Sequence, residues 1–248
     1  MSYLRESLVG LVILLVAFAP TATAQTAIRV TDVAGTTVDL QDVRLDYTDY
    51  RFGAVLISQM RELVGVRVSR GGGEITVTWD KIKQITVKDG GGEITPQEGA
   101  PITVQFVGGP ILRGWADLGR YHLPFAKVAR MVVLGPSDYK YSEYRDVDAV
   151  VTDGTGTVTQ LTKVESLDVA LGEGTVSIPP WSLGELNVES VDQATGTTRG
   201  VMVRNDSAVK VPAMFRSDAI LKGQSDLGPF EIRLSSVRRI TFKQQERR

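Results

Sequence analysis

The chain has 248 residues, with 28 Lys or Arg and 29 Asp or Glu, so its formal net charge is −1 and no general electrostatic attraction to nucleic acid is expected. It contains no Cys, which excludes disulfides, thiolate nucleophiles and Cys-ligated metals, and its one histidine, His122, excludes sites that need two. Hydrophobic residues make up 42% of the chain, enough for packed cores, and 25 glycines suit a fold with many turns.

The N-terminal residues have the features of a secretory signal peptide. Arg5 precedes a mainly apolar run over residues 8–19, which is too short to span a bilayer as a helix. Pro20 ends the run, and Ala22 and Ala24 occupy the small-residue positions that a signal peptidase reads. We therefore predict that residues 1–24 are a signal peptide and that the protein is periplasmic or extracellular, with no transmembrane segment after cleavage. The alternative is a buried N-terminal helix.

Four blocks of the sequence share one ungapped pattern of apolar residues. Each block begins with a glycine, and six apolar positions follow, here numbered repeat positions one to six. They are Ile75, Val77, Trp79, Ile82, Ile85 and Val87 after Gly73; Tyr121, Leu123, Phe125, Val128, Met131 and Val133 after Gly119; Val176, Ile178, Pro180, Leu183, Leu186 and Val188 after Gly174; and Phe230, Ile232, Leu234, Val237, Ile240 and Phe242 after Gly228. Only Pro180 departs from the apolar pattern.

The spacing within each block predicts a strand, a single helical turn and a second strand. Positions one to three alternate with polar residues, as in a strand with one buried face. The steps of three residues from position three to position five fit one 3₁₀ turn, and position six begins the closing strand. Many small SH3-like or Sm-like barrels end this way. We therefore predict an all-β chain of tandem barrels of this kind, or of partly open ones, and assign the leading glycine to a hairpin that needs a positive φ.

A longer duplication lies over the four blocks. Residues 111–119 match residues 220–228, and residues 30–36 resemble residues 151–157. The expected order of modules is therefore A-B-A′-B′. Their predicted bounds are 25–88 for A, 100–134 for B, 148–189 for A′ and 197–242 for B′, with a linker at 135–147 and a polar tail at 243–248.

One segment breaks the strand pattern. Leu56, Met60 and Leu63 lie at i, i+4 and i+7, which is the spacing of an apolar stripe on a helix. This predicts a short helix near residues 54–63, with an irregular loop as the alternative.

Two motifs carry a family resemblance. Residues 73–82, with the sequence GEITVTWDKI, resemble the small β module that precedes the barrel in some bacterial outer-membrane proteins of uncharacterised function. Asp117-Leu118-Gly119 and Asp226-Leu227-Gly228 are similar to repeats in other exported bacterial proteins of unknown role. The resemblance covers the repeated block alone, and it implies an envelope location without a known activity.

Residues able to carry chemistry are few. His122 falls between two inward-facing positions of its block, so an exposed strand histidine is expected. Asp117 and Asp226 occupy equivalent places, and paired carboxylates can perform acid–base work, but an Asp before Leu-Gly also suits a turn, which we favour. The glycine runs at 71–73 and 90–92 lack the Lys-Ser/Thr of a phosphate loop. No catalytic, metal or cofactor site is predicted.

Aromatic residues offer the better candidates for binding a partner. Trp115 alternates with inward-facing residues and has Gln224 as its duplicate, which indicates that it is at least partly exposed, although burial against a neighbouring module remains the favoured interpretation. Trp181 aligns with the outward-facing Asp80, although the two prolines before it could shift the register and bury it. The linker adds three further candidates. They are Tyr139, Tyr141 and Tyr144.

These observations point to an exported, non-catalytic binding or scaffolding protein of the bacterial cell envelope. Its expected partner is an envelope protein or a polysaccharide. The alternatives are a carboxylate-based hydrolase of the periplasm and a carbohydrate-binding protein that uses exposed Trp side chains.

Overall fold

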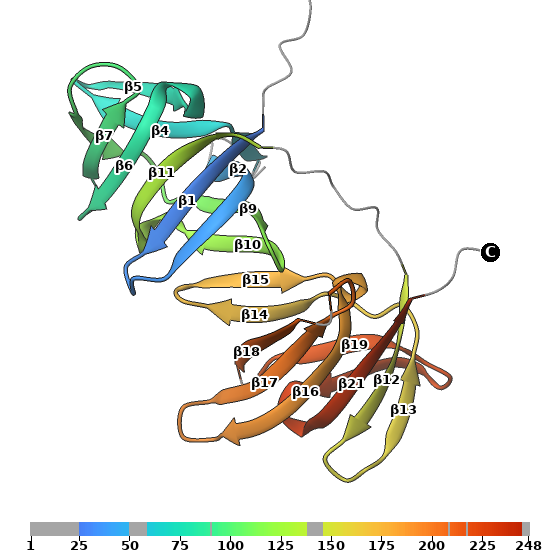
Figure 1. The fold of residues 1–248 in the computed structure, drawn as a ribbon. Coiled ribbons are helices and arrows are strands. Elements are labelled where there is room, and N and C mark those ends of the chain that lie inside the picture. The colour runs from blue at the N-terminus through green and yellow to red at the C-terminus, as the bar shows by residue number, and fades with distance from the viewer. Residues whose placement is uncertain are drawn as a thin grey trace, which may run out of the picture.

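The computed structural model describes residues 25–49, 59–89, 91–137, 146–207, 209–216 and 218–244 (Figure 1). The described chain is built of β-strands joined by turns and four single 3₁₀ turns. The first half, residues 25–137, contains β1 (Thr26–Asp32), β2 (Thr37–Asp49), β3 (Gln59–Leu63), β4 (Gly65–Arg70), β5 (Gly73–Thr78), η2 (Trp79–Lys81), β6 (Ile82–Lys88), β7 (Gly91–Pro96), β8 (Ile102–Phe106), β9 (Ile111–Ala116), β10 (Gly119–Pro124), η3 (Phe125–Lys127) and β11 (Val128–Pro136).

The second half, residues 146–244, contains β12 (Val147–Asp153), β13 (Val158–Leu161), β14 (Leu167–Leu171), β15 (Gly174–Ile178), η4 (Pro180–Ser182), β16 (Leu183–Asp192), β17 (Thr197–Arg204), β18 (Lys210–Arg216), β19 (Ile220–Ser225), β20 (Gly228–Arg233), η5 (Leu234–Ser236) and β21 (Val237–Gln244). In the described part of the chain, no helix is long and apolar enough to cross a membrane.

The strands of each half pair in the same order. In the first half the antiparallel pairings run β5-β4-β8-β7-β6-β11-β1-β2-β9-β10, with β3 added to β2. In the second half they run β15-β14-β18-β17-β16-β21-β12-β13, and a single bridge from Thr162 to Gln224 continues to β19-β20. Because β10 also pairs with β15, the described strands form one open series that begins at β5 and ends at β20.

The pairing nests one group of strands inside another. The hairpin β1–β2 pairs with β9 and β11, whereas β4 to β8 lie between them in sequence and pair among themselves. The second half repeats this arrangement, with β14 to β18 enclosed between β13 and β19. The segments predicted as modules A (25–88) and B (100–134) are therefore interleaved in space.

The repeated blocks take the predicted course in all four copies. Each begins with a strand at its leading glycine, passes through a 3₁₀ turn that starts at repeat position three, and continues into a strand at position four. Repeat positions three, four and five are buried in every copy. All of them except Pro180 belong to the hydrophobic core, and their burial is the main stabilising contribution that the repeat supplies.

Positions one and two do not behave alike. They are buried at Tyr121 and Leu123 of the second block and at Val176 and Ile178 of the third, but only partly buried in the fourth, and Ile75 of the first block is 52% exposed. The leading glycines also differ. A left-handed φ occurs at Gly119 (158°) and Gly228 (121°), whereas at the other two blocks it occurs in the preceding turn instead.

The second duplication is also visible in the turns after β1 and β12. In the first turn the Asp32 backbone N–H donates to Thr36 O at 3.0 Å, and the Thr36 N–H donates to the Asp32 carboxylate at 2.8 Å. Asp153 and Thr157 repeat both bonds, at 3.0 and 2.9 Å. The shared spacing of Asp, Gly and Thr thus encodes one turn, because the carboxylate accepts an N–H that the turn leaves unpaired.

The helix expected near residues 54–63 is a wrong prediction where the chain is described. Residues 59–63 form β3, which pairs with the C-terminal part of β2, Leu63 opposite Leu45. Strand β2 extends beyond its pairing with β1 and offers an unpaired edge, and this tertiary partner overrides the helical spacing. Residues 54–58 lie outside the described residues. At the other end of the chain, β21 continues to Gln244 and so includes the first two residues of the predicted tail.

Candidate functional site: the groove between the two halves

The two halves meet where β10 pairs with β15 (Figure 1). Three residue pairs form this junction, with Tyr121 opposite Val176 at its centre. A glycine on each side permits the close approach. A β-carbon on Gly174 would overlap the Tyr121 ring, and one on Gly119 would overlap the backbone of Ser177. The junction is therefore packed backbone against side chain, which favours a fixed arrangement of the halves.

Asp32 ties the second half to the first. It is only 2% exposed, and while its Oδ1 accepts the Thr36 N–H, its Oδ2 accepts the backbone N–H of Glu173 at 2.8 Å. The Glu173 carboxylate in turn forms an ion pair with Lys127 at 3.0 Å. The tip of the β14–β15 hairpin is thus held from both its backbone and its side chain.

An open groove of about 870 Å³ runs beside this junction, and we call it the junction groove. It is bordered by β1–β2, by the β9–β10 hairpin and by β14–β15. The residues that line it are Arg29, Thr37, Val38, Asp39, Gln41, Trp115, Ala116, Asp117, Leu118, Leu171, Val176 and Arg204. The lining includes apolar and charged side chains, so the groove offers apolar contact area together with polar groups that can fix a ligand's orientation.

Trp115 forms part of the groove wall and is partly exposed, as its duplicate Gln224 indicates and contrary to the favoured burial against a neighbouring module. Strand β9 places it between Gln41 of β2 and Arg120 of β10. The Arg120 guanidinium carbon lies 5.6 Å from the centroid of the ring, so a cation covers one region of the indole and holds its orientation. The ring remains partly exposed toward the groove.

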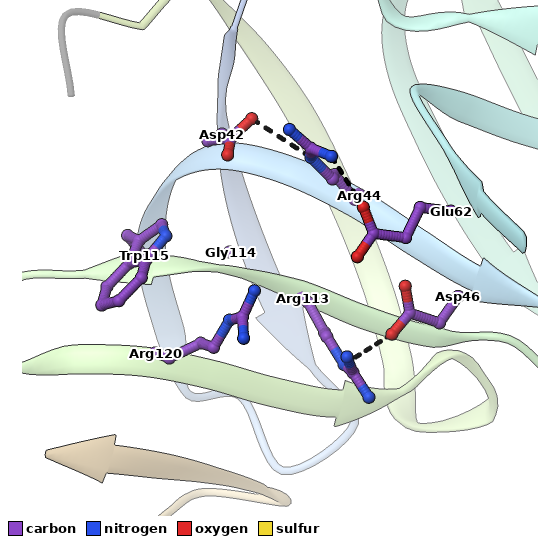
Figure 2. A pocket seen from close by; sticks show the side chains of 8 residues that line it. All are labelled: Asp42, Arg44, Asp46, Glu62, Arg113, Gly114, Trp115 and Arg120. Carbon is purple, nitrogen blue, oxygen red and sulfur yellow. Dashed lines mark hydrogen bonds and ion pairs between the residues drawn. The ribbon is translucent and has the colours of Figure 1, made fainter. Parts of the chain in front are cut away.

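Trp115 also borders a small polar pocket of about 90 Å³ (Figure 2). Besides Trp115 the pocket is lined by Asp42, Arg44, Asp46, Glu62, Arg113, Gly114 and Arg120. Arg44 bonds to Glu62 at 2.6 Å and to Asp42 at 3.4 Å, and Arg113 Nε lies 2.5 Å from Asp46 Oδ2. Most of the charged side chains that line the pocket therefore form ion pairs with one another.

Burial shifts the proton affinities of two groups beside this pocket. Asp46 is 5% exposed, and burial raises the pKa of its carboxyl, an effect that Arg113 opposes. The pKa of His122 is lowered, because burial disfavours the imidazolium and because Arg113 and Arg120 repel it. The expectation of a freely exposed histidine is corrected here: His122 is partly buried, since Thr175 of β15 lies opposite it across the junction.

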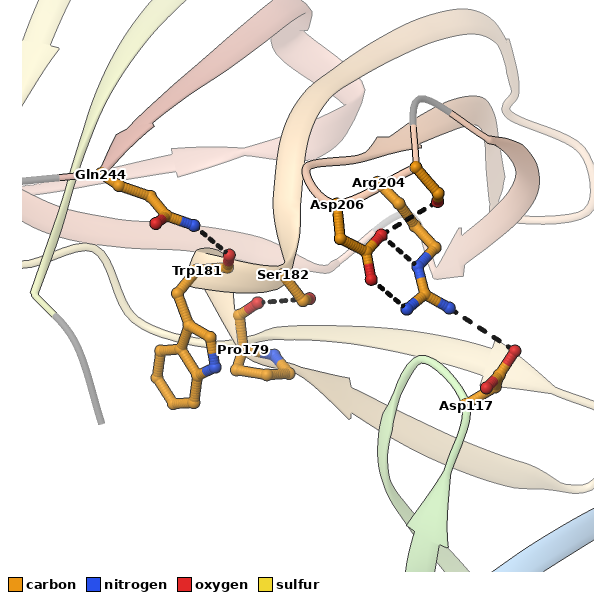
Figure 3. Close-up of polar contacts among 8 residues, drawn as sticks. Asp117, Pro179, Trp181, Ser182, Arg204, Asp206 and Gln244 are labelled. Atoms are coloured by element: carbon orange, nitrogen blue, oxygen red, sulfur yellow. Dashed lines mark hydrogen bonds and ion pairs between the residues drawn. The ribbon is translucent and has the colours of Figure 1, made fainter. Parts of the chain in front are cut away.

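The opposite rim of the groove is formed by Arg204 at the end of β17 (Figure 3). Its guanidinium bonds to Asp206 at 2.7 and 3.0 Å and reaches Asp117 at 3.5 Å. Asp117 is in the β9–β10 turn with its side chain 97% exposed. Its duplicate, Asp226, is in the β19–β20 turn and does not line this groove. Both therefore lie in turns, as favoured from the sequence.

Trp181 is partly exposed, as the aligned register predicts. Pro180 fills the buried repeat position, so the prolines do not shift the frame, and the Trp181 carbonyl accepts a bond from Gln244 Nε2 at 2.7 Å (Figure 3). Trp181 does not line the junction groove, so the structure does not bring the two tryptophans into one site. The three linker tyrosines, Tyr139, Tyr141 and Tyr144, lie outside the described residues.

Several groove residues were not found from the sequence. Leu171 and Arg204 reach the groove only because β10 pairs with β15, and no local sequence pattern predicts that pairing. The polar pocket did leave a signal, since Asp42, Arg44 and Asp46 alternate along β2 and so share one face. Among the described residues, no group of His, Asp and Glu has the arrangement of a metal site.

Comparison of the chain with protein-family models, with curated proteins and with solved structures gives no match.

Proposed function

We propose that this chain is an exported, non-catalytic binding or scaffolding protein of the bacterial cell envelope, and that the junction groove holds a segment of a partner protein. The observation that carries the proposal is the partly exposed ring of Trp115, on the wall of a groove where the two halves are held together. Aromatic and Arg side chains surrounded by apolar contacts are the residues that dominate protein–protein binding energies.

The groove favours a protein segment over a polysaccharide. A sugar ring stacks on the open face of an aromatic side chain, but Arg120 already lies over the ring of Trp115. Partly exposed apolar residues from both halves, among them Leu118 and Leu171, instead suit apolar side chains of a peptide. A carboxylate hydrolase receives no support from the two duplicated aspartates, because Asp117 and Asp226 stand on different hairpins.

The fold proposed for each group of strands is SH3-like. In the order β11-β1-β2-β9-β10, the 3₁₀ turn η3 joins the last strand of the series to the first, as the short helix does before the final strand of such barrels. The nested group β6-β7-β8-β4-β5 has a circularly permuted version of the same strand order. In this group η2 joins β5 to β6, as η3 joins β10 to β11. The signal peptide predicted over residues 1–24 supports an action outside the cytoplasm, and N-terminal sequencing of the purified protein is expected to begin at Gln25.

Photo-crosslinking in cells tests the binding proposal. The full-length gene is expressed in a bacterium with a benzoyl-phenylalanine crosslinker at Asp117, on the groove rim, or at Val158, which is 59% exposed and does not line the groove. The proposal expects a discrete envelope-protein adduct from position 117 and none from position 158.

The matched variant is Trp115→Gln, because the duplicate position already carries Gln224 in the same strand context. Loss of an anchoring Trp is expected to weaken binding at least about tenfold and so to remove the adduct at position 117. An adduct that survives Trp115→Gln unchanged contradicts the proposal. A polysaccharide adduct at position 117 that Trp115→Gln removes would establish the carbohydrate-binding alternative instead.

A further inference from the structure

The two ends of the strand series are duplicates of the two strands that meet at the junction. Strand β5 corresponds to β15, and β20 corresponds to β10, because each pair begins at equivalent leading glycines. At the junction β10 and β15 pair with each other. In the described part of the chain, β5 pairs with β4 alone and β20 with β19 alone. One molecule therefore presents, at opposite ends of the series, copies of two strands that pair in its middle.

Equivalent side chains are buried on the junction strands β10 and β15 but more exposed on the outer strands β5 and β20, as expected if only the junction strands have a partner. At repeat position one, Tyr121 and Val176 at the junction are each 1% exposed, whereas Ile75 on β5 is 52% exposed and Phe230 on β20 is partly exposed. Leu227 in the β19–β20 turn is 94% exposed, although its duplicate, Leu118, packs against the core. The outer strands thus carry apolar side chains that the inner strands cover by pairing.

The outer strands also keep a glycine at the positions where the junction needs room for the facing strand. Gly174 must lack a side chain because Tyr121 occupies that space. Its duplicate, Gly73, has no left-handed φ, and the nearest atom to a β-carbon there is Arg70 O at 3.8 Å, so nothing within its own hairpin requires glycine. Gly228, the duplicate of Gly119, also faces open space, but its φ of 121° requires glycine within its own hairpin, so Gly73 carries this argument.

Three substitutions oppose the same pairing at the outer ends. Transferring the junction register would place Thr76 opposite Pro229, Ile75 opposite Phe230, and Glu74 opposite Glu231, where the junction has Ser177–Arg120, Val176–Tyr121 and Thr175–His122. Gly119 pairs with Ala116 to close a two-residue turn, so the next residue, Arg120, directs its backbone N–H toward β15. Pro229 lacks that N–H, and facing glutamates repel each other.

We propose that β20 of one copy of this chain is complementary to β5 of a second copy, as β10 is to β15 at the junction. Pro229, and Glu74 facing Glu231, prevent the two edges from pairing in the natural chain. Proline and charged residues on exposed edge strands are a common protection against edge-to-edge association. The contact would be heterologous, β20 of one copy on β5 of the next, so it would grow open chains and would not close as a symmetric dimer.

Sedimentation analysis of the protein purified after expression of the full-length gene tests this. The natural chain is expected to stay monomeric over about a hundredfold range of concentration. The triple variant Glu74→Thr, Pro229→Arg, Glu231→His carries the junction residues at the outer edges. Its average mass is expected to rise with concentration to about twice that of the monomer or more.

Two controls make the outcome specific. Adding Ile75→Lys to the triple variant places a charge at the centre of the proposed contact, and it is expected to restore the monomer. Because the chain has no Cys, Ile75→Cys and Phe230→Cys can be introduced on separate triple-variant chains, and a disulfide between them is expected only with the transferred register. A monomeric triple variant, association that Ile75→Lys does not reverse, or the same disulfide between Ile75→Cys and Phe230→Cys chains that keep Glu74, Pro229 and Glu231 would each overturn the proposal.

Discussion

Ile85 lies directly opposite Met131 where β6 pairs with β11, and both residues hold repeat position five of their blocks. Leu186 and Ile240 meet in the same way where β16 pairs with β21. Because equivalent residues face each other across antiparallel strands, the two blocks of each half are related by a local two-fold axis. The repeat therefore builds its core by pairing with its own copy.

Truncation at this axis is expected to be costly. Met131 is 1% exposed, so Met131→Ala should lower the free energy of unfolding by about 2–5 kcal/mol through lost burial and the cavity that remains. The matched control is Ile75→Ala, at an apolar repeat position that is 52% exposed, which should change it by less than about 0.5 kcal/mol. Urea denaturation measures both, and equal losses would contradict the core assigned here.

The glycines at the junction give a second prediction. Gly174→Ala should destabilise the protein, because its new methyl group would overlap the Tyr121 ring and force the halves apart. Gly73→Ala, at the equivalent position of the first block, has room for the methyl group and should be tolerated. Thermal denaturation and small-angle scattering report on the two effects, and a larger loss from Gly73→Ala would refute the close approach.

Asp32 and Asp153 occupy equivalent turns, but only Asp32 also contacts the other half of the chain, so substituting each of them distinguishes the two roles. Asp153 uses Oδ1 for its bonds to the N–H groups of Thr155 and Thr157, and an asparagine oxygen can replace it. Asp32 uses both oxygens, so Asp32→Asn leaves either the Thr36 or the Glu173 N–H without an acceptor. We expect Asp32→Asn to cost about 1–3 kcal/mol because the group is buried, and Asp153→Asn to be nearly neutral. Chemical denaturation at neutral pH distinguishes this from the opposite order.

Stability is expected to depend on the protonation of His122. Its pKa is lowered in the folded state, so between that pKa and the ordinary value of 6.5 the unfolded chain binds more protons. Stability therefore falls as pH drops through 6.5 and stops changing, for this group, below the folded pKa. Since His122 is the only histidine, its proton NMR signal gives the folded pKa directly.

The control for this effect is His122→Gln, which should remove the fall in stability between neutral pH and mildly acidic pH. Arg113→Gln should move the pKa of His122 upward, because one of the two repelling cations is gone. A folded pKa above 6.5 would show that the carboxylates of Asp168 and Asp46 outweigh burial and the arginines.

The parts of the fold that depend on local spacing could be predicted, and those that depend on distant partners could not. The 3₁₀ turns and the burial at Ile82, Val128, Leu183 and Val237 follow from a spacing that repeats within each block. The exposure of Ile75 could not be predicted from the spacing within its block, because it depends on whether another strand lies beside β5. The same limit applies to the groove: Trp115 was identified by comparison with Gln224, whereas Arg204 reaches it from another half of the chain.

Nesting also sets an order in which the chain can assemble. A chain that emerges N-terminus first releases β1–β2 long before β9 and β11, their partners, so this hairpin must wait with unpaired edges. Strands β4 to β8 can meanwhile pair among themselves within residues 65–106, and only the pairing of β6 with β11 must wait for the later chain. Distant pairings of this kind form slowly because the intervening loop must be ordered first, and an inner group that is already folded shortens that loop. In each half the inner group of strands can therefore fold first, and the outer strands then pair around it.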